Sequence, residues 1–385
     1  MTILAHVVSL FVAFLKGFNK LAKYLAEGEK VLSPMSQRDW EDKSVAKVKV
    51  LDDKILRKAE SGPSFSPISV DGSTRMLSAP HFTAYIVGVA VYGLKDGGVL
   101  QFIPGSLGTK FVAVRATRET LKKIEGDDEL NFVVVKDSTG KYFDENYNGT
   151  DGDLLDELRV SMENKALMQI AEKDAGRLIV VDGPVYLDHW AKTRLAQMRL
   201  GTLEKLRERD FTVVGVVKRV KSRKLCTPEV LDALSLNVDE RHCNDLYVIS
   251  RLAPREGIYV VGPFEAVYGE KQANNKGRNL MYYIYRDYMP DKVFWYISAY
   301  GSIYRVEVLK QDYRDEVEEI VRYLAYHTTK RGVPYDIDVA DSCARRYSAS
   351  LLVMLRAAVK SYGVPLTYES EEAYRLALRD VARGA

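Results

Sequence analysis

Two Asp-Gly pairs follow apolar, strand-like runs, in Val70-Asp71-Gly72-Ser73 and Val181-Asp182-Gly183-Pro184. In each, a carboxylate stands at the end of a strand predicted to be buried, and the glycine allows a sharp turn and a close approach by a ligand. The carboxyl ends of parallel strands line the edge at which open α/β sheets bind ligands. Two such carboxylates side by side would bind a hard divalent cation, because these cations prefer oxygen ligands. The alternative is that each aspartate only starts a turn or caps a helix.

Further carboxylates that could complete such a site lie on predicted helices. Glu157 and Glu163 both fall in a helix predicted over 153–174, between the two Asp-Gly pairs. Glu163 borders the apolar stripe of that helix and is the better candidate, whereas Glu157 lies further round. Solvent exposure is the alternative for both. Asp341 stands at the start of the penultimate long helix, where it would also interact favourably with the helix dipole.

Basic residues in one segment could bind phosphate groups. Lys218 follows a predicted buried strand, Thr212–Val217, that should lie parallel to the strand ending at Asp182, so Lys218 would face a bound phosphate. Five positive charges fall within seven positions, enough for a local phosphate track: Lys218, Arg219, Lys221, Arg223 and Lys224. Arg75 is a further candidate. The alternatives are a solvated strand end for Lys218 and an exposed basic loop for the others.

Aromatic residues are frequent near the end of the β-rich region and could stack on unpaired bases. Aromatic residues in strands more often belong to a core or an interface, and we expect that of most of them. The candidates are Tyr282, Tyr283, Tyr285, Tyr288, Phe294, Trp295, Tyr296, Tyr300 and Tyr304.

The elements that must position these residues form a mixed α/β sheet. Arg177–Val181 is a short apolar run typical of a buried strand, followed by a helix predicted over 187–208 and the strand Thr212–Val217. This crossover requires a parallel pair, whereas hairpins predicted over 68–103 are antiparallel. Further strands are predicted over 130–136, 246–249, 258–261, 293–298 and 304–308, and helices over 314–326, 342–361 and 369–381.

The first part of the chain is predicted to stand apart from this sheet. Residues 2–28 have the periodicity of an amphipathic helix whose strongly apolar run is too short to span a membrane. It would pack on the body of the protein or dock a partner or second subunit, with a membrane-surface helix as a third interpretation. Residues 29–65 read as a connector with one short helix. We therefore expect an N-terminal segment, 1–65, and a main domain, 66–385.

Composition narrows the class of protein. The 385 residues carry a net charge of +3, which excludes a histone-like polycation but leaves room for a local basic groove. Cys226, Cys243 and Cys343 show no C-x-x-C spacing, and the five histidines form no H-x-x-x-H motif, so a zinc site has no support. With no signal peptide pattern, these features predict a cytoplasmic protein without a disulfide framework.

In order and spacing, these motifs resemble those of the NurA nuclease family. The resemblance covers roughly residues 65–345 and implies a ribonuclease-H-like mixed sheet flanked by helices, with an extra β-rich segment. Its pieces are Val70–Ser73, Leu158-Arg159 with Glu163, Ile179–Pro184, Val214–Arg219, Tyr304–Glu307, and Gly332–Pro334 leading to Ala340-Asp341.

The resemblance also implies an activity. The family cleaves single-stranded DNA and resects DNA ends 5′ to 3′ with Mn²⁺ or Mg²⁺, so we expect a nuclease that uses a pair of ions. The implied metal ligands are Asp71, Glu163, Asp182 and Asp341, with Lys218 near the scissile phosphate. The implied partners are single-stranded DNA, duplex ends, a HerA-type hexameric ATPase and a second copy of the chain, with no membrane.

Two positions depart from the family pattern. Asp341 falls where many members carry histidine, and Val333 where many carry tyrosine. An aspartate still binds a hard cation. Tyr335, two residues after Val333, is a candidate to replace the missing tyrosine. The alternative function is a nuclease-inactive DNA clamp that regulates a motor. A third interpretation is an unrelated membrane-associated α/β protein.

Overall fold

The computed structural model describes most of the chain and divides it into two compact units. The described residues are 16–24, 46–61, 64–93, 100–101, 111–127, 130, 150–173, 177–188, 193–220, 222–238, 243–254, 256–268 and 289–382. The first unit comprises residues 1–38, 71–169 and 340–385, and the second comprises 39–70 and 170–339. Three long elements contribute residues to both units: β3 (Ile68–Ala79), α3 (Asp151–Lys173) and α9 (Tyr335–Ser361).

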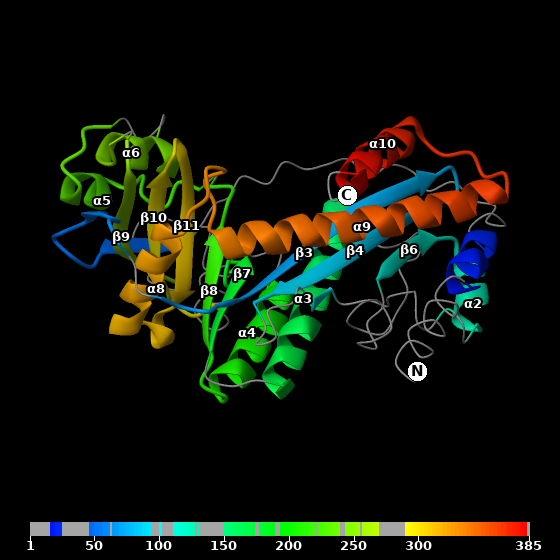
Figure 1. Cartoon of the computed structure of the whole chain (residues 1–385), viewed down its shortest axis with the longest axis horizontal. Coiled ribbons are helices and arrows are strands. Elements are labelled where there is room, and N and C mark those ends of the chain that lie inside the picture. The colour runs from blue at the N-terminus through cyan, green and yellow to red at the C-terminus, as the bar shows by residue number, and fades with distance from the viewer. Residues whose placement is uncertain are drawn as a thin grey trace, which may run out of the picture. The chain divides into compact units, whose positions relative to one another are not determined.

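The second unit is built on a mixed sheet (Figure 1). Its strands follow the order β1-β9-β10-β11-β8-β7, and the first residues of β3 pair with β7. The strands are β1 (Lys47–Val50), β2 (Leu56–Lys58), β7 (Leu178–Asp182), β8 (Thr212–Val217), β9 (Ile258–Val267), β10 (Lys292–Ala299) and β11 (Ser302–Leu309), and the helices are α4 (Thr193–Arg207), α5 (Pro228–Ala233), α6 (Asp245–Leu252), the short 3₁₀ helix η4 (Lys310–Asp312) and α8 (Asp315–Tyr326).

Strand direction confirms the predicted ribonuclease-H-like mixed sheet. β7 pairs in parallel with β8 and with the start of β3, whereas β11 runs antiparallel to β8. The strand–helix–strand crossover predicted over 177–217 is β7–α4–β8. Its helix begins at Thr193 rather than at Leu187.

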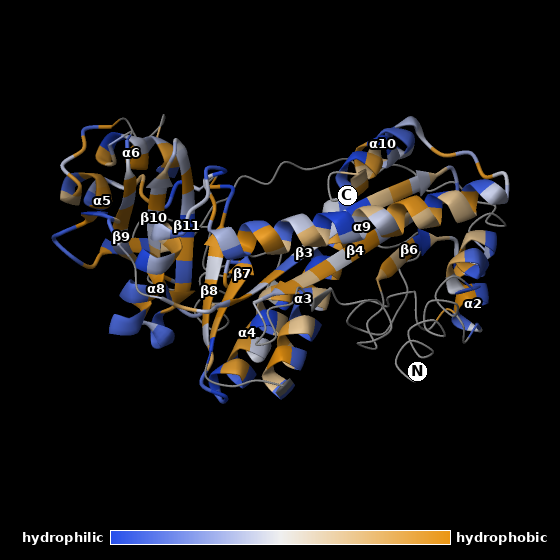
Figure 2. Cartoon of the chain, viewed as in Figure 1, coloured by the Kyte–Doolittle hydropathy of each residue, from blue (hydrophilic) through white to orange (hydrophobic). Residues whose placement is uncertain are grey.

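The core of the second unit lies between the sheet and α8. Val317, Ile320, Val321 and Leu324 recur at helical spacing on α8 and are all buried. They pack in one cluster with strand residues such as Trp295, Val180 and Val214, and in Figure 2 the strands β7 and β8 are mostly orange. Burial of each such side chain stabilises the fold by about 1.5–3 kcal/mol.

The first unit joins the rest of β3 to a set of hairpins and helices. β3 and β4 (Phe82–Tyr92) are neighbours linked by the two-residue turn Pro80-His81, and β4 also pairs with the two remaining strands. The other elements are β5 (Leu100–Gln101), β6 (Val112–Ala116), α2 (Arg118–Glu125), α3 (Asp151–Lys173), which ends within the second unit, and α10 (Tyr368–Ala382).

Residues 16–24 are helical and pack on the first unit. Phe18 is buried and stacks on Phe111 with ring centroids 5.2 Å apart, and Lys20 forms an ion pair with Asp127 at 2.7 Å. This part of the predicted N-terminal helix therefore contacts the body of the protein, and the rest of it lies outside the described residues. Within the described parts of the chain, no helix is both long and apolar enough to cross a membrane.

Two local predictions were wrong. Residues 246–249, predicted as a strand, belong to α6, because Asn244 accepts a hydrogen bond from the Tyr247 backbone N–H at 2.9 Å and starts a helix. The predicted connector, 29–65, contains β1 and β2, which both pair with β9 and so belong to the sheet. The strand predicted over 130–136 lies, apart from Leu130, outside the described residues.

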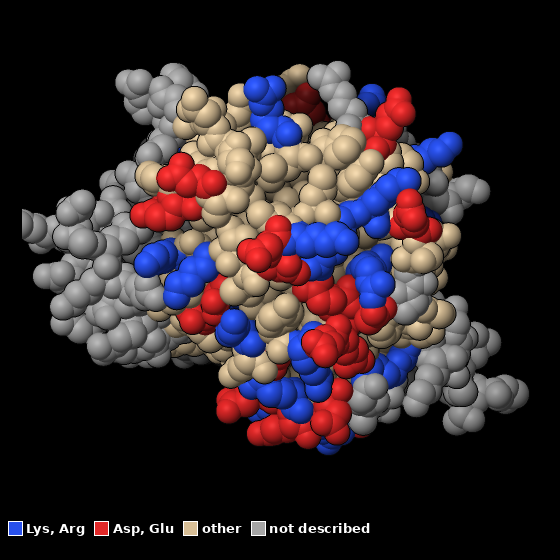
Figure 3. Space-filling model, turned by 90° about the vertical axis from the view of Figure 1, so that its left-hand side faces the viewer, with Lys and Arg blue, Asp and Glu red and all other residues tan. Residues whose placement is uncertain are grey.

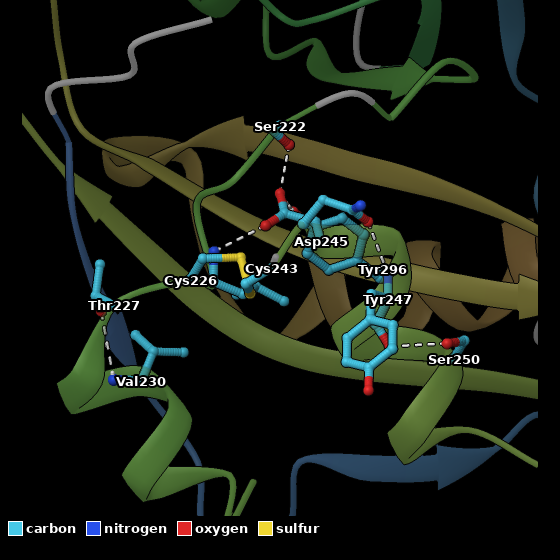
Figure 4. Close-up of a disulfide and its surroundings, with 11 residues drawn as sticks. Ser222, Cys226, Thr227, Val230, Cys243, Asp245, Tyr247, Ser250 and Tyr296 are labelled. Atoms are coloured by element: carbon cyan, nitrogen blue, oxygen red, sulfur yellow. Dashed lines mark hydrogen bonds between the residues drawn. A yellow bond between two sulfur atoms is a disulfide. The ribbon is translucent and has the colours of Figure 1, made fainter. Parts of the chain in front are cut away.

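The cysteine prediction was also wrong. Cys226 and Cys243 form a disulfide, across a sequence separation of 17 residues (Figure 4). It joins the loop after β8 to the residues before α6. Beside it, the buried Asp245 accepts hydrogen bonds from Ser222 Oγ and from the Leu225 backbone N–H. The pairing depends on the fold of this loop, and spacing alone carried no signal of it.

Candidate metal centre

Asp71 and Asp182 take equivalent positions on neighbouring parallel strands. The pairing of β3 with β7 runs to Val70 opposite Val181, and each aspartate is the next residue on its strand. Val70 and Val181 are buried and hold the two strands in this register. The sequence therefore brings two carboxylates to the same edge by repeating one pattern, an apolar run followed by Asp-Gly.

Asp341 on α9 joins these two aspartates. One carboxylate oxygen from each of Asp71, Asp182 and Asp341 lies within 4.8 Å of the other two. Oxygens that bind one Mg²⁺ at 2.0–2.1 Å are at most about 4.2 Å apart, so side-chain shifts of roughly half an ångström would complete a shared site. Asp71 and Asp341 are buried and Asp182 is partly exposed. An all-carboxylate set of this size fits a hard divalent cation.

Two of the three aspartates form ion pairs with cationic side chains. Lys218 Nζ lies 2.5 Å from Asp182 Oδ2, and Arg345 Nη2 lies 2.9 Å from Asp341 Oδ2. Lys218 follows the last residue of β8, as the sequence predicted, and is partly exposed. It is therefore held at the edge by the same carboxylate that would bind a metal.

Glu163 lies beside β3 but is not one of the three grouped aspartates. It is buried on α3 and pairs with Arg159, one turn earlier, at 3.2 Å. A Cβ atom at Gly72 would stand 2.8 Å from Glu163 Oε1 and 2.9 Å from Arg159 Cγ. The glycine after Asp71 thus leaves the space that Glu163 fills.

A second glycine accommodates the turn after Asp182. Gly183 has a φ of +105° and donates a backbone hydrogen bond to the Val216 carbonyl at 2.8 Å, so the chain folds back over β8. A Cβ atom at Gly215 would stand only 2.4 Å from the Val185 backbone nitrogen. This close approach of two backbones requires glycine at residue 215.

The predicted phosphate-binding residues differ from one another in exposure and in their ion-pair partners. Arg219 and Arg223 are exposed, whereas Lys224 is buried and bonds to Asp188 at 2.8 Å, so it does not join an exposed basic track. Lys221 lies outside the described residues. Arg75 forms an ion pair with Asp380 at 2.5 Å and donates to Ser348 at 3.2 Å, contacts that tie β3 to α10 and α9.

Of the five predicted aromatic residues that the structure describes, four belong to the core, as expected. Phe294, Trp295, Tyr296 and Tyr304 are fully buried, and residues 282–288 lie outside the described parts of the chain. Tyr300 differs: its side chain is 54% exposed at the tip of the β10–β11 hairpin, where its φ is +52°. Tyr335 is also exposed, at the first residue of α9.

A buried network of charged side chains lies next to the turn after β7. Glu307 accepts hydrogen bonds from the Val185 backbone N–H at 2.8 Å, from Lys292 at 2.9 Å and from Arg305 at 3.1 Å. Burial alone would raise the pKa of Glu307, but Lys292 and Arg305 outweigh it and hold that pKa below its ordinary value. The sequence analysis did not predict this network.

The sequence does contain a signal for it. Arg305 and Glu307 are two residues apart on one strand and so point to the same face, although their neighbours Tyr304, Val306 and Val308 are apolar. Paired opposite charges within an otherwise buried strand indicate a polar network inside the protein.

The comparisons with known proteins identify the family. Residues 67–346 match the NurA domain. The fold is similar to that of the NurA nuclease from Sulfolobus solfataricus, at 11% identity and a TM-score of 0.46, covering 80% of this chain and 88% of that one. A NurA structure bound to dAMP and manganese gives 10% identity and a TM-score of 0.37, with 74% and 86% covered.

The catalytic domain of human endonuclease V gives 14% identity and a TM-score of 0.33, covering 89% of this chain and 98% of that one. No curated protein matches the sequence. The domain match spans well over half of the 385 residues, and its first and last residues enclose all of the grouped aspartates. The chain therefore belongs to the NurA family of nucleases.

Proposed function

We propose that this chain is a metal-dependent DNA nuclease that cuts single-stranded DNA and resects DNA ends 5′ to 3′. The observation that carries the proposal is the approach of Asp71, Asp182 and Asp341 to within 4.8 Å of one another in a NurA domain. Mn²⁺ or Mg²⁺ would bind there, with Glu163 completing the ligand set from α3. A pair of such ions, when bound, would activate a water molecule and stabilise the leaving oxygen.

The chain's own residues have distinct roles in this proposal. The aspartates would hold the cations at the end of β7 and beside it, and the burial of Asp71 and Asp341 would limit competition from water. Lys218 moves its ammonium group from Asp182 toward the scissile phosphate, whose charge it partly neutralises. Arg219 and Arg223, both exposed, bind the phosphates that follow, and Tyr300 stacks on an unpaired base.

Cleavage of end-labelled single-stranded DNA with Mn²⁺, Mg²⁺ or EDTA tests the activity. We expect metal-dependent cleavage that Asp71→Asn reduces by at least about a thousandfold, since the amide removes a charged ligand. Asp338→Asn is the matched control, because Asp338 lies on the same helix as Asp341 but pairs with Arg331 at 2.5 Å. Near-normal cleavage by Asp71→Asn would refute the assignment.

The alternative is a nuclease-inactive DNA clamp that regulates a motor. Two observations favour it: Val333 stands where many relatives carry tyrosine, and Asp182, Asp341 and Glu163 each form an ion pair within the chain. Binding of DNA without cleavage under any metal would support the clamp.

We further propose that the protein acts in the cytoplasm as a homodimer with a HerA-type hexameric ATPase in repair of double-strand breaks. The support is the family membership. Co-purification with such an ATPase, and the mass of the complex in solution, test the partnership. The Cys226–Cys243 disulfide makes the redox state of the isolated protein an additional check on the cellular compartment.

A further inference from the structure

The turn after β7 carries the chain away from Asp182, and a buried carboxylate, that of Glu307, bonds to it. Glu307 is opposite Gly215 in the β11–β8 pairing, and Gly215 is opposite Val181 in the β8–β7 pairing. Side chains at such positions point to the same face of a sheet. Because Gly215 has no side chain, Glu307 reaches across it to the Val185 backbone N–H, which it binds at 2.8 Å.

The same carboxylate is fixed on its other sides by buried cations. Lys292 donates to Glu307 Oε1 at 2.9 Å and to the Tyr186 carbonyl at 2.9 Å, so one ammonium group holds both Glu307 and the turn. Arg305 donates to Glu307 Oε2 at 3.1 Å. Glu307 and Lys292 are each only 1% exposed. A carboxylate that is buried to this degree and bonded on both oxygens has little freedom to move.

We propose that Glu307 is a positioning residue for the metal centre: through the Val185 N–H it fixes the 183–185 turn and so the orientation of Asp182. This inference rests on the proposed function. Val185 is three residues from Asp182, and between them lies a turn in which Gly183 has a φ of +105° and bonds to the Val216 carbonyl. Loss of the Val185 acceptor would let that turn, and the aspartate before it, adopt other conformations.

Outer hydrogen-bond partners of metal ligands commonly change metal affinity 10–100-fold when they are removed. Glu307→Met removes the acceptor for the Val185 N–H, whereas the amide oxygen of a glutamine would keep one. We therefore expect Glu307→Met to weaken direct Mn²⁺ binding, measured by calorimetry or by the electron paramagnetic resonance of free Mn²⁺, by about tenfold, the lower end of that range, because Glu307 acts through the turn and not on Asp182 directly. The Mn²⁺ concentration for half-maximal DNA cleavage should rise in parallel, whereas the rate at saturating Mn²⁺ should change less.

Asp245→Asn is the matched control. Asp245 is a buried carboxylate of the same unit that holds the Leu225 N–H at 2.8 Å and Tyr296 at 2.6 Å, away from the 183–185 turn. It should lower stability and leave Mn²⁺ affinity unchanged. If Glu307→Met does not fold, the double variant Glu307→Met/Lys292→Met removes one charge of each sign together with the Val185 acceptor, and the same loss of affinity is expected.

Unchanged Mn²⁺ affinity in a folded Glu307 variant, beside a wild type that binds Mn²⁺, would overturn this inference alone. An equal loss of affinity in Asp245→Asn would also overturn it, because any buried carboxylate would then have the same effect. A wild type that binds no Mn²⁺ would overturn the proposed function and this inference with it.

Discussion

Gly72 is the residue that admits a glutamate next to the proposed metal ligands. A Cβ atom at this position would stand 2.8 Å from Glu163 Oε1 and 2.9 Å from Arg159 Cγ, closer than carbon contacts allow. The Arg159 atom lies in the middle of its side chain, so it cannot easily move aside. A side chain at residue 72 would instead displace Glu163.

We therefore expect Gly72→Ala to lower DNA cleavage about 10–100-fold, because a small displacement of a catalytic group has an effect of this size. Gly201→Ala is the control, since a Cβ atom there meets nothing within 4 Å on α4. It should leave cleavage unchanged. Steady-state rates at several Mn²⁺ concentrations measure both variants, and full activity in Gly72→Ala would remove Glu163 from the ligand set.

For single residues, the sequence was a good guide to which side chains could bind a metal and a poor guide to which side chains are buried. Asp71 and Asp182 were predictable because a repeated local pattern places them. Asp341 was expected at a helix start, which was wrong, because α9 begins at Tyr335 and Asp341 lies six residues further along it. The family resemblance was therefore the better indication of Asp341. The burial of Lys224 was not predictable, because it depends on Asp188 and Tyr268, which are 36 and 44 residues away. Local sequence does not reveal the partner that makes a buried lysine tolerable.

Among the elements, the loop between β8 and α6 is the one closed by a covalent bond. The Cys226–Cys243 disulfide spans 17 residues and encloses α5. We expect reduction to lower the free energy of unfolding by about 3 kcal/mol, since the unfolded chain regains the freedom of that loop. Urea unfolding with and without a phosphine reductant measures the change.

The double variant Cys226→Ser/Cys243→Ser is the control for this measurement, because its stability should not respond to reductant. A wild type with the same unfolding midpoint under both conditions would show that the disulfide contributes nothing to stability.

Prediction of elements succeeded where hydrophobic runs were bounded by clear turn residues. The strand over 212–217 agrees with the structure at both ends, because Asp210 and Lys218 enclose a continuous apolar run. The prediction of a strand over 246–249 failed, because a short apolar run fits a strand or a helix equally well. These residues form a helix because Asn244 caps it at its N-terminus. The strands β1 and β2 were missed because they are polar and because their partner, β9, is far from them in the sequence.

For the whole molecule, buried charge links stability to pH. Glu307 has a pKa below its ordinary value of 4.5, and Asp188 has one well below 3.8, because burial is outweighed by neighbouring lysine and arginine side chains. Both groups bind fewer protons in the folded chain than in the unfolded chain. Their contribution to stability is therefore complete above about pH 5 and is lost as the pH falls through the lowered values.

We expect the free energy of unfolding to decrease steadily between about pH 5 and pH 3, with a smaller decrease in Glu307→Gln. Urea unfolding at a series of pH values measures both slopes. Equal slopes in the two proteins would show that Glu307 does not carry this dependence.

The surface carries charges of both signs. On the face that Figure 3 shows, Lys and Arg are interspersed with Asp and Glu. The net charge of +3 over 385 residues agrees with this mixture. DNA would therefore be attracted by local groups such as Arg219 and Arg223, and a mixed face of this kind provides little long-range steering.

The buried network of the second unit also constrains how the sequence can evolve. It contains three cations, Lys224, Lys292 and Arg305, and three anions, Asp188, Asp245 and Glu307, so its charges cancel. A single substitution leaves an unmatched charge in the interior, at a cost of about 3–5 kcal/mol, whereas the exchange of an opposite pair for apolar residues is tolerated. In related sequences we therefore expect these positions to change in pairs of opposite charge, and sequences in which only one member of a pair has changed should be rare.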